Sequence, residues 1–261
     1  AITAISCDKE DKVATDPPTD ALSGYTMLGS QKINNDAWNV SLYMGEDPFV
    51  GYNYVAVRVS DEATGSMIEG ATVSFMPMMD MGTMMHSCPY ESPSYDSGMD
   101  AYMGTSTFIM PSTAGSWMFN IMVNNQGEMD TATFSIAVMA KPESKLYNFI
   151  SDVDSTTAYF VALKEPMNPE IGLNDFELMI YKRMSMMSFP PVSDLKVKID
   201  PEMPSMGHGS PNNVDPASMG EGLYQGKVNF TMSGYWKVNV TVSDNSDATL
   251  DDMGAFDITL K

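Results

Sequence analysis

The sequence predicts an all-β protein built from two tandem immunoglobulin-like β-sandwich domains. Short segments such as NYVAVRVSD (53–61) and SWMFNIMVNN (116–125) place β-branched or aromatic residues at alternate positions. This is the pattern of half-buried antiparallel strands, and no stretch shows a convincing helical period. The second half of the chain also repeats the first, which predicts two copies of one fold.

The repeat is clearest where YMGTSTFIMPSTAGSWMFNIMV (102–123) aligns with YQGKVNFTMSGYWKVNVTV (224–242). Four residues of the first segment match four of the second at one constant offset: Tyr102, Gly104, Phe108 and Met110 match Tyr224, Gly226, Phe230 and Met232. After a turn that differs in length, Trp117 matches Trp236. Several strands in each copy fit an immunoglobulin-like sandwich, so we expect both tryptophans to pack between the sheets.

The chain divides into three segments. Residues 1–22 precede the two predicted domains and include a polar, proline-containing tether, DKEDKVATDPPTDAL (8–22). Residues 23–142 and 143–261 are the two sandwich domains, with the joint near AKPESKL (140–146). With 43% hydrophobic residues in 261, the chain is able to bury substantial cores.

Charge and composition exclude several classes of function. The formal net charge is −20 and no basic patch is visible, which argues against nucleic acid as a partner. No apolar run reaches the roughly 18 residues that a membrane helix needs. The two histidines have no Ser-His-Asp or Cys-His arrangement around them, so the sequence does not predict an enzyme.

The first twelve residues, AITAISCDKEDK, resemble the end of a bacterial lipoprotein signal peptide. The acidic and lysine residues after Cys7 are similar to the export tag of surface lipoproteins in Bacteroidetes. The resemblance implies that residues 1–22 are a signal remnant (1–6) followed by a lipoprotein tether. It also implies that Cys7 is lipidated and anchors the protein to the outer membrane of the cell envelope, in a surface-exposed position. The alternative is an ordinary N-terminal tail that happens to contain a cysteine.

Methionine is unusually frequent, with 26 copies, and the repeat places some of them in a shared loop. At the constant offset, Met203, Met206 and His208 fall on Met81, Met84 and His86, so each copy carries Met-x-x-Met-x-His. Thioether and imidazole are good ligands for Cu(I), whereas zinc sites use Cys, His and carboxylate. The pattern predicts a copper(I) site in each loop, and the alternative is methionine used only for packing.

The first loop lies in a richer segment, MPMMDMGTMMHSC (76–88). Met79, Met85 and Cys88 are additional candidate ligands there, and Cys88 would supply a thiolate. The second copy has Ser210 in place of the cysteine.

Other methionines are assigned to packing. Met110 and Met232 lie eight residues beyond the tyrosine that follows each loop, so an extended strand would carry them about 25 Å away. We therefore expect them in the cores; the alternative, a fourth ligand for each loop, requires a long loop that folds back over the sheet. A third cluster, Met184, Met186 and Met187, is expected at a hairpin tip that packs on the neighbouring domain, at the opposite end from the second loop, and the alternative is a metal site.

The segment MPSMGHGS (203–210), followed by GLYQGKVNFTMSGYWKVNV (222–240), resembles the YtkA-like and FixH-like group. The resemblance implies small sandwich domains of bacterial envelopes that are associated with copper handling. The predicted function is thus a copper(I)-binding or copper-handling envelope lipoprotein, whose partners would be other envelope or surface proteins. The alternative is a non-catalytic surface interaction module that binds no metal.

Overall fold

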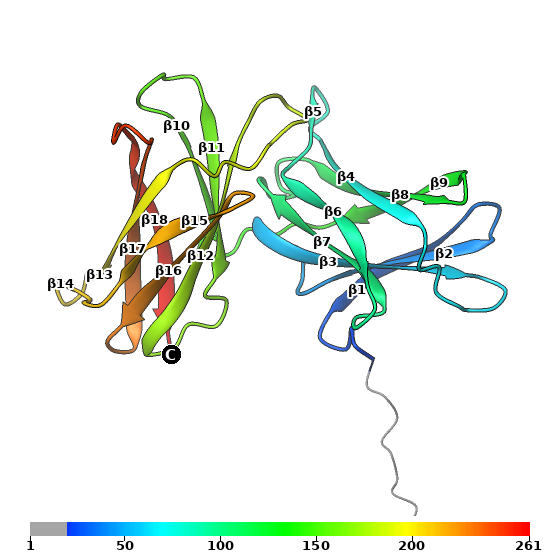
Figure 1. The fold of residues 1–261 in the computed structure, drawn as a ribbon, viewed down its shortest axis with the longest axis horizontal. Coiled ribbons are helices and arrows are strands. Elements are labelled where there is room, and N and C mark those ends of the chain that lie inside the picture. The colour runs from blue at the N-terminus through cyan, green and yellow to red at the C-terminus, as the bar shows by residue number, and fades with distance from the viewer. Residues whose placement is uncertain (1–19) are drawn as a thin grey trace, which may run out of the picture.

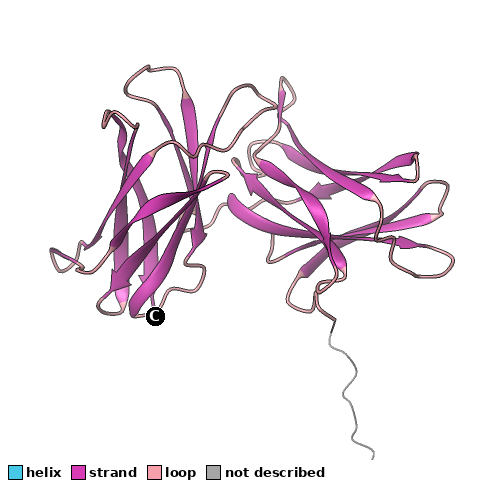
Figure 2. Cartoon of the chain, in the orientation of Figure 1, coloured by secondary structure: helices cyan, strands magenta, loops and turns pink. Residues whose placement is uncertain are grey.

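The computed structural model describes residues 20–261, which form strands joined by loops and turns (Figure 2). The strands build two β-sandwiches, one after the other along the chain (Figure 1). In this described range, no helix has the length and apolar character needed to cross a membrane. The predicted all-β fold class is confirmed.

The first sandwich contains nine strands: β1 (Thr26–Ile33), β2 (Trp38–Met44), β3 (Gly51–Asp61), β4 (Thr72–Asp80), β5 (Met85–His86), β6 (Tyr90–Asp96), β7 (Ala101–Phe108), β8 (Ser116–Asn125) and β9 (Glu128–Ile136). One sheet has the order β1-β2-β3-β7-β6 and the other β5-β4-β8-β9.

The second sandwich repeats this plan: β10 (Leu146–Ile150), β11 (Ala158–Glu165), β12 (Gly172–Lys182), β13 (Lys196–Met203), β14 (His208–Gly209), β15 (Val214–Gly220), β16 (Leu223–Phe230), β17 (Gly234–Ser243) and β18 (Thr249–Leu260). Its sheets have the orders β10-β11-β12-β16-β15 and β14-β13-β17-β18.

The strand order defines an immunoglobulin-like topology in both sandwiches. Strands β2-β3-β7-β6 and β4-β8-β9 correspond to the ABED and CFG sheets of a constant-type immunoglobulin domain. The second sandwich has the same arrangement in β11-β12-β16-β15 and β13-β17-β18. Each copy adds one strand at the edge of the first sheet and a two-residue strand, β5 or β14, at the edge of the second.

Matching contacts support the internal repeat. Trp117 and Trp236 are fully buried, and their indole nitrogens donate to the carbonyl oxygens of Met110 (2.9 Å) and Met232 (3.1 Å). The hydroxyl of Tyr102 donates to a carbonyl and accepts an amide in the β3–β4 loop, and the hydroxyl of Tyr224 does the same in the β12–β13 loop. The expectation that both tryptophans lie in the cores is confirmed.

The two sandwiches meet at an apolar joint. Tyr52, from β3, packs with a cluster from the second sandwich whose other buried members are Leu146, Ala158, Phe160, Ala162, Met179, Tyr181 and Phe189. The Thr107 hydroxyl lies 3.4 Å from that of Tyr181, and the Ser87 amide donates to the carbonyl of Met186 at 2.8 Å. A shared apolar cluster of this kind restricts the relative motion of two domains.

Candidate metal centre

The first Met-His loop (residues 81–86) is a tight hairpin between β4 and β5, at the edge of a sheet and beside the joint (Figure 1). Gly82 has a φ of 80°, which glycine adopts without strain, and its amide donates to a carboxylate oxygen of Asp80 at 2.7 Å. The Met81 amide donates to the Met84 carbonyl at 3.0 Å. This turn brings Met81 and Met84 close to His86.

His86 is buried, with only 3% of its surface exposed. Its Nδ1 lies 2.7 Å from the carbonyl oxygen of Ser87, which only accepts hydrogen bonds, so Nδ1 carries the proton. In the neutral imidazole, Nε2 then has a free lone pair. Nε2 is buried and has no hydrogen-bond partner among residues 20–261.

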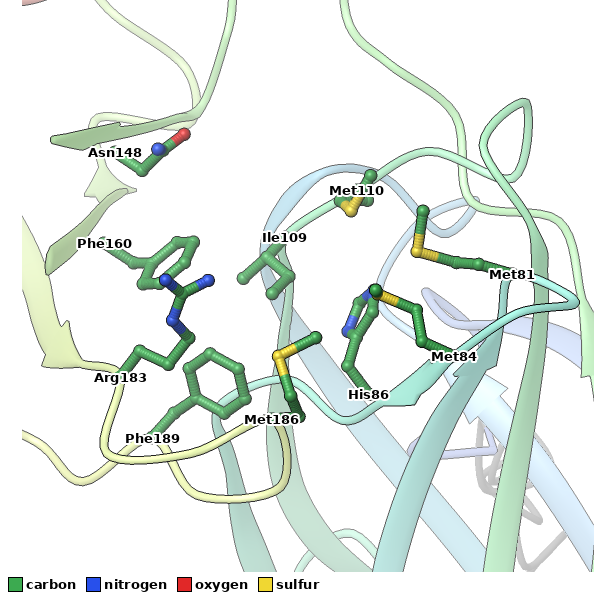
Figure 3. A pocket seen from close by; sticks show the side chains of 10 residues that line it. All are labelled: Met81, Met84, His86, Ile109, Met110, Asn148, Phe160, Arg183, Met186 and Phe189. Carbon is green, nitrogen blue, oxygen red and sulfur yellow. The ribbon is translucent and has the colours of Figure 1, made fainter. Parts of the chain in front are cut away.

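The His86 ring faces a cavity of about 350 Å³ between the two sandwiches (Figure 3). Four thioethers line it together with the imidazole, three from the first sandwich and one from the second (Figure 3). The complete lining is Met81, Met84, His86, Ile109, Met110, Asn148, Phe160, Arg183, Met186 and Phe189. No carboxylate belongs to it.

These donors favour a soft, singly charged ion. Thioether sulfur and neutral imidazole suit Cu(I), whereas hard cations need oxygen ligands and zinc sites draw on Cys, His and carboxylate. Across residues 20–261, no three His, Cys, Asp or Glu side chains come together as a metal-binding group. The guanidinium of Arg183 adds a positive charge to the lining, which further disfavours a divalent ion.

Met110 is partly buried against the first core and also lines this cavity, so the expectation of a core position holds only in part, and the estimate that separated Met110 from the loop is wrong. The estimate of about 25 Å treated the chain after Tyr102 as leading away from the loop. Instead β6 runs away from the loop, and β7 returns antiparallel to β6, so Met110 at the end of β7 arrives back beside His86. Met232, at the equivalent place in the second sandwich, is 38% exposed and is not a core residue.

The second Met-His loop (residues 203–208) has a different register. His208 pairs with Met203, whereas His86 pairs with Met79. Six residues (80–85) separate the first pair and four (204–207) the second, so the first loop is two residues longer. The prediction that Met203 and Met81 are equivalent is therefore wrong, because a two-residue insertion shifts the alignment.

Packing confirms which methionines correspond. A Cβ built on Gly115 would lie 3.0 Å from the methyl of Met79, and one on Gly234 would lie 3.3 Å from the methyl of Met203. Both methionines are buried in their cores. Met203 is thus the counterpart of Met79.

The donors of the second loop are more open. Met206 is 61% exposed, and the His208 ring is half-buried, with Nδ1 2.9 Å from the carbonyl oxygen of Gly209. Its ring lies edge-on to Trp236 with centroids 6.0 Å apart, as the His86 ring does to Trp117 at 5.5 Å. Strand β14 lies at the far end of the second sandwich from the joint, so no part of the first sandwich covers this loop (Figure 1).

The additional candidate ligands do not line the cavity. Met85 is exposed and is absent from the cavity lining, and Met79 is buried in the core. Cys88 is also in the core, with its sulfur 3.4 Å from the Ser106 hydroxyl. Burial raises the pKa of the Cys88 thiol to about 12, against a small lowering by the Ser106 hydrogen bond. Cys7 lies outside the described residues.

The second wall of the cavity was not foreseen from sequence. The prediction that the third methionine cluster packs on the neighbouring sandwich is confirmed for Met186, whose carbonyl accepts from the Ser87 amide, whereas Met184 and Met187 are more exposed. The cluster lies at the opposite end of the second sandwich from the second loop, as predicted (Figure 1). Its Met186 also lines the cavity, together with Arg183 and Asn148. In the sequence, the one feature that indicated this wall was a methionine cluster outside the repeated motif. That cluster could not be assigned to the cavity without knowing how the two sandwiches are joined.

Fold and site define a tandem immunoglobulin-like protein with a donor-lined cavity at its joint. A family model described as YtkA-like matches residues 155–241, which lie in the second sandwich and include the second Met-His loop. No curated protein matches the chain.

Three solved structures have low similarity to the chain. FdeC, an Escherichia coli adhesin, is 14% identical with a TM-score of 0.28, over 93% of this chain and 83% of that one. Invasin, a bacterial integrin-binding protein, is 12% identical with a TM-score of 0.27, over 85% and 39%. A chimeric titin Z1Z2 tandem is 11% identical with a TM-score of 0.22, over 90% and 97%. The strand order, rather than these scores, defines the fold.

Proposed function

We propose that this protein is a copper(I)-binding or copper-handling envelope lipoprotein whose principal site is the cavity around His86. The observation that carries the proposal is the buried Nε2 of His86, which faces thioethers and has no hydrogen-bond partner among the described residues. Leaving such a group unsatisfied costs about 1–3 kcal/mol. A bound soft ion would remove that cost.

The proposed ligands from the first sandwich are Nε2 of His86 and the thioethers of Met81, Met84 and Met110. The three thioethers carry no competing proton, and the imidazole binds an ion through Nε2 in its neutral form. A cavity with one guanidinium and no carboxylate offers little to a hard divalent ion, which supports Cu(I) over Zn²⁺ or Ca²⁺.

We propose a weaker and more accessible site at the second loop, with His208 and Met206 as donors. Met203 is left out of this donor set because it is buried beneath the loop. The YtkA-like match to residues 155–241 supports the resemblance on which the envelope setting rests.

A matched pair of substitutions in the first loop tests the principal site. Met84 and Met85 are neighbours with similar exposure, 51% and 46%, but only Met84 lines the cavity. Titration with Cu(I) against a chromophoric chelator should show one tight ion per chain. Met84→Leu should weaken its binding by about tenfold or more, and Met85→Leu by less than about twofold, because leucine keeps the volume but removes the sulfur.

Two outcomes would contradict the proposal. If the wild-type chain takes up no Cu(I), the methionines serve packing, and the alternative of a metal-free surface interaction module is favoured. If Met84→Leu and Met85→Leu bind equally, the ion is not held in the cavity.

The cellular setting is proposed from sequence. Lipidation of Cys7 would anchor the protein to the outer membrane, where envelope or surface proteins would be its partners and exchange of copper, rather than catalysis, its role. Mass spectrometry of the N-terminal peptide from native membranes should find a lipid-modified Cys7. An unmodified Cys7 preceded by residues 1–6 would contradict lipidation.

A further inference from the structure

The cavity around His86 has walls from both sandwiches. Five of its lining residues come from the first sandwich and five from the second (Figure 3). On the second wall, the lining contains one residue with a soft donor atom, Met186. Figure 3 shows its thioether reaching into the same space as the side chains of His86 and Met84.

Met186 belongs to a tight turn, the cap hairpin (residues 184–188), between β12 and β13. The amide of Met184 donates to the Ser188 carbonyl at 2.9 Å, and the amide of Met187 to the Ser185 hydroxyl at 3.1 Å. Immediately after the turn, Phe189 is buried and packs on Phe160 with ring centroids 5.6 Å apart. The backbone of the turn is therefore held by its own hydrogen bonds, and the packing of Phe189 fixes the end of the turn to the second sandwich.

A direct backbone bond ties the cap hairpin to the first loop. The Ser87 amide donates to the carbonyl oxygen of Met186 at 2.8 Å, and Ser87 is the residue whose own carbonyl fixes the His86 tautomer. The position of Met186 relative to the His86 ring is thus set by one hydrogen bond between adjacent backbone segments. Packing within the second sandwich does not explain a methionine here, since the residue is 38% exposed.

We propose that Met186 is a metal ligand donated across the joint, so that the first site is complete only when both sandwiches are in place. This rests on the proposed function. An ion held by His86 and Met186 would link the two domains, and linkage requires the effect to be reciprocal. The joint strengthens ion binding by the same factor as the ion strengthens the joint.

The test compares Met186→Leu with Met187→Leu in the full chain, using Ag(I) as the probe. Met187 is its neighbour in the cap hairpin, 48% exposed, and does not line the cavity. Met186→Leu should weaken Ag(I) binding by about tenfold, and X-ray absorption should count one sulfur fewer around the ion. Met187→Leu should match the wild type in both measurements.

A second measurement reports on the joint itself. One equivalent of Ag(I) should slow proteolysis of the linker (residues 137–145) in the wild type and in Met187→Leu, and should lose that effect in Met186→Leu. If the wild type binds Ag(I) and both variants behave alike, the inference is overturned while the proposed function stands. If Ag(I) binding is absent, or unchanged by His86→Ala, the proposed function fails and the inference with it.

Discussion

The two Met-His loops occupy the same place in two copies of one fold, yet their surroundings differ. Each loop joins the first strand of a three-stranded CFG sheet to a two-residue edge strand, and each histidine lies edge-on to a buried tryptophan. His86 is buried at the joint, where the second sandwich forms half of its cavity. His208 lies half-buried on a face at the far end of the molecule.

The difference shows that the motif alone does not produce an enclosed set of donor atoms. Both histidines direct Nδ1 to the carbonyl of the next residue, which leaves Nε2 as the free nitrogen in each loop. Only at His86 is that nitrogen buried without a hydrogen-bond partner among residues 20–261, because a longer loop and the cap hairpin enclose it. His208 is half-buried, so solvent is able to hydrogen-bond its imidazole without an ion.

The largest predicted effect distinguishes the two loops by substituting the histidine of each in turn. His86→Ala should weaken Cu(I) binding at the proposed tight site by about a hundredfold, or ~2.7 kcal/mol, because it removes the imidazole ligand from an enclosed donor set. His208→Ala should leave that site unchanged and affect only a weaker second equivalent. Competition titrations of both variants with a chromophoric chelator measure this.

Thermal unfolding of both histidine variants controls for misfolding, because His86 is buried and its loss leaves a cavity. Equal loss of tight binding in the two variants would contradict the comparison, since it would mean that the loops act as equivalent sites.

A smaller effect is predicted for Met79 and Met203, the corresponding core methionines beneath the two loops. Met79→Leu and Met203→Leu should each lower the free energy of unfolding by less than about 1.5 kcal/mol, as volume-conserving core changes do. Neither should change Cu(I) affinity by more than about twofold, since neither residue lines the cavity. Chemical denaturation and chelator competition give the two values. A large loss of Cu(I) affinity in Met203→Leu would show that Met203 is a ligand after all.

Much of the fold was predictable from sequence because it depends on local patterns. Alternation of apolar and polar residues gives the strands, and the repeat of Tyr102 and Trp117 at Tyr224 and Trp236 gives two copies of one topology. The same alignment correctly paired His86 with His208 as loop residues. It mispaired Met81 with Met203, because a constant offset cannot show an insertion inside a loop.

The site was only partly predictable because it depends on contacts between distant segments. Met110 returns to the loop through the β6–β7 hairpin, which a count of residues along an extended chain misses. Met186 reaches the cavity from the other sandwich, and its place follows from how the two domains pack. Neither contact leaves a signal in the spacing of residues around His86.

The smallest predicted effect concerns Cys88, which the sequence offered as an advantage of the first loop over the second. A thiol binds Cu(I) as thiolate, and burial raises the pKa of Cys88 to about 12, so it stays protonated at neutral pH. Its sulfur faces Ser106 in the core and does not line the cavity.

Cys88→Ala should therefore leave Cu(I) affinity within about twofold of the wild type while costing about 1 kcal/mol of stability through the lost packing. In the native wild-type protein, Cys88 should also resist alkylation at about pH 8 and react only after unfolding, because the thiol is both protonated and enclosed. A tenfold loss of Cu(I) affinity in Cys88→Ala would show that the thiol reaches the ion, and the difference between the two loops would then rest on Cys88 and Ser210 as well as on the cap hairpin.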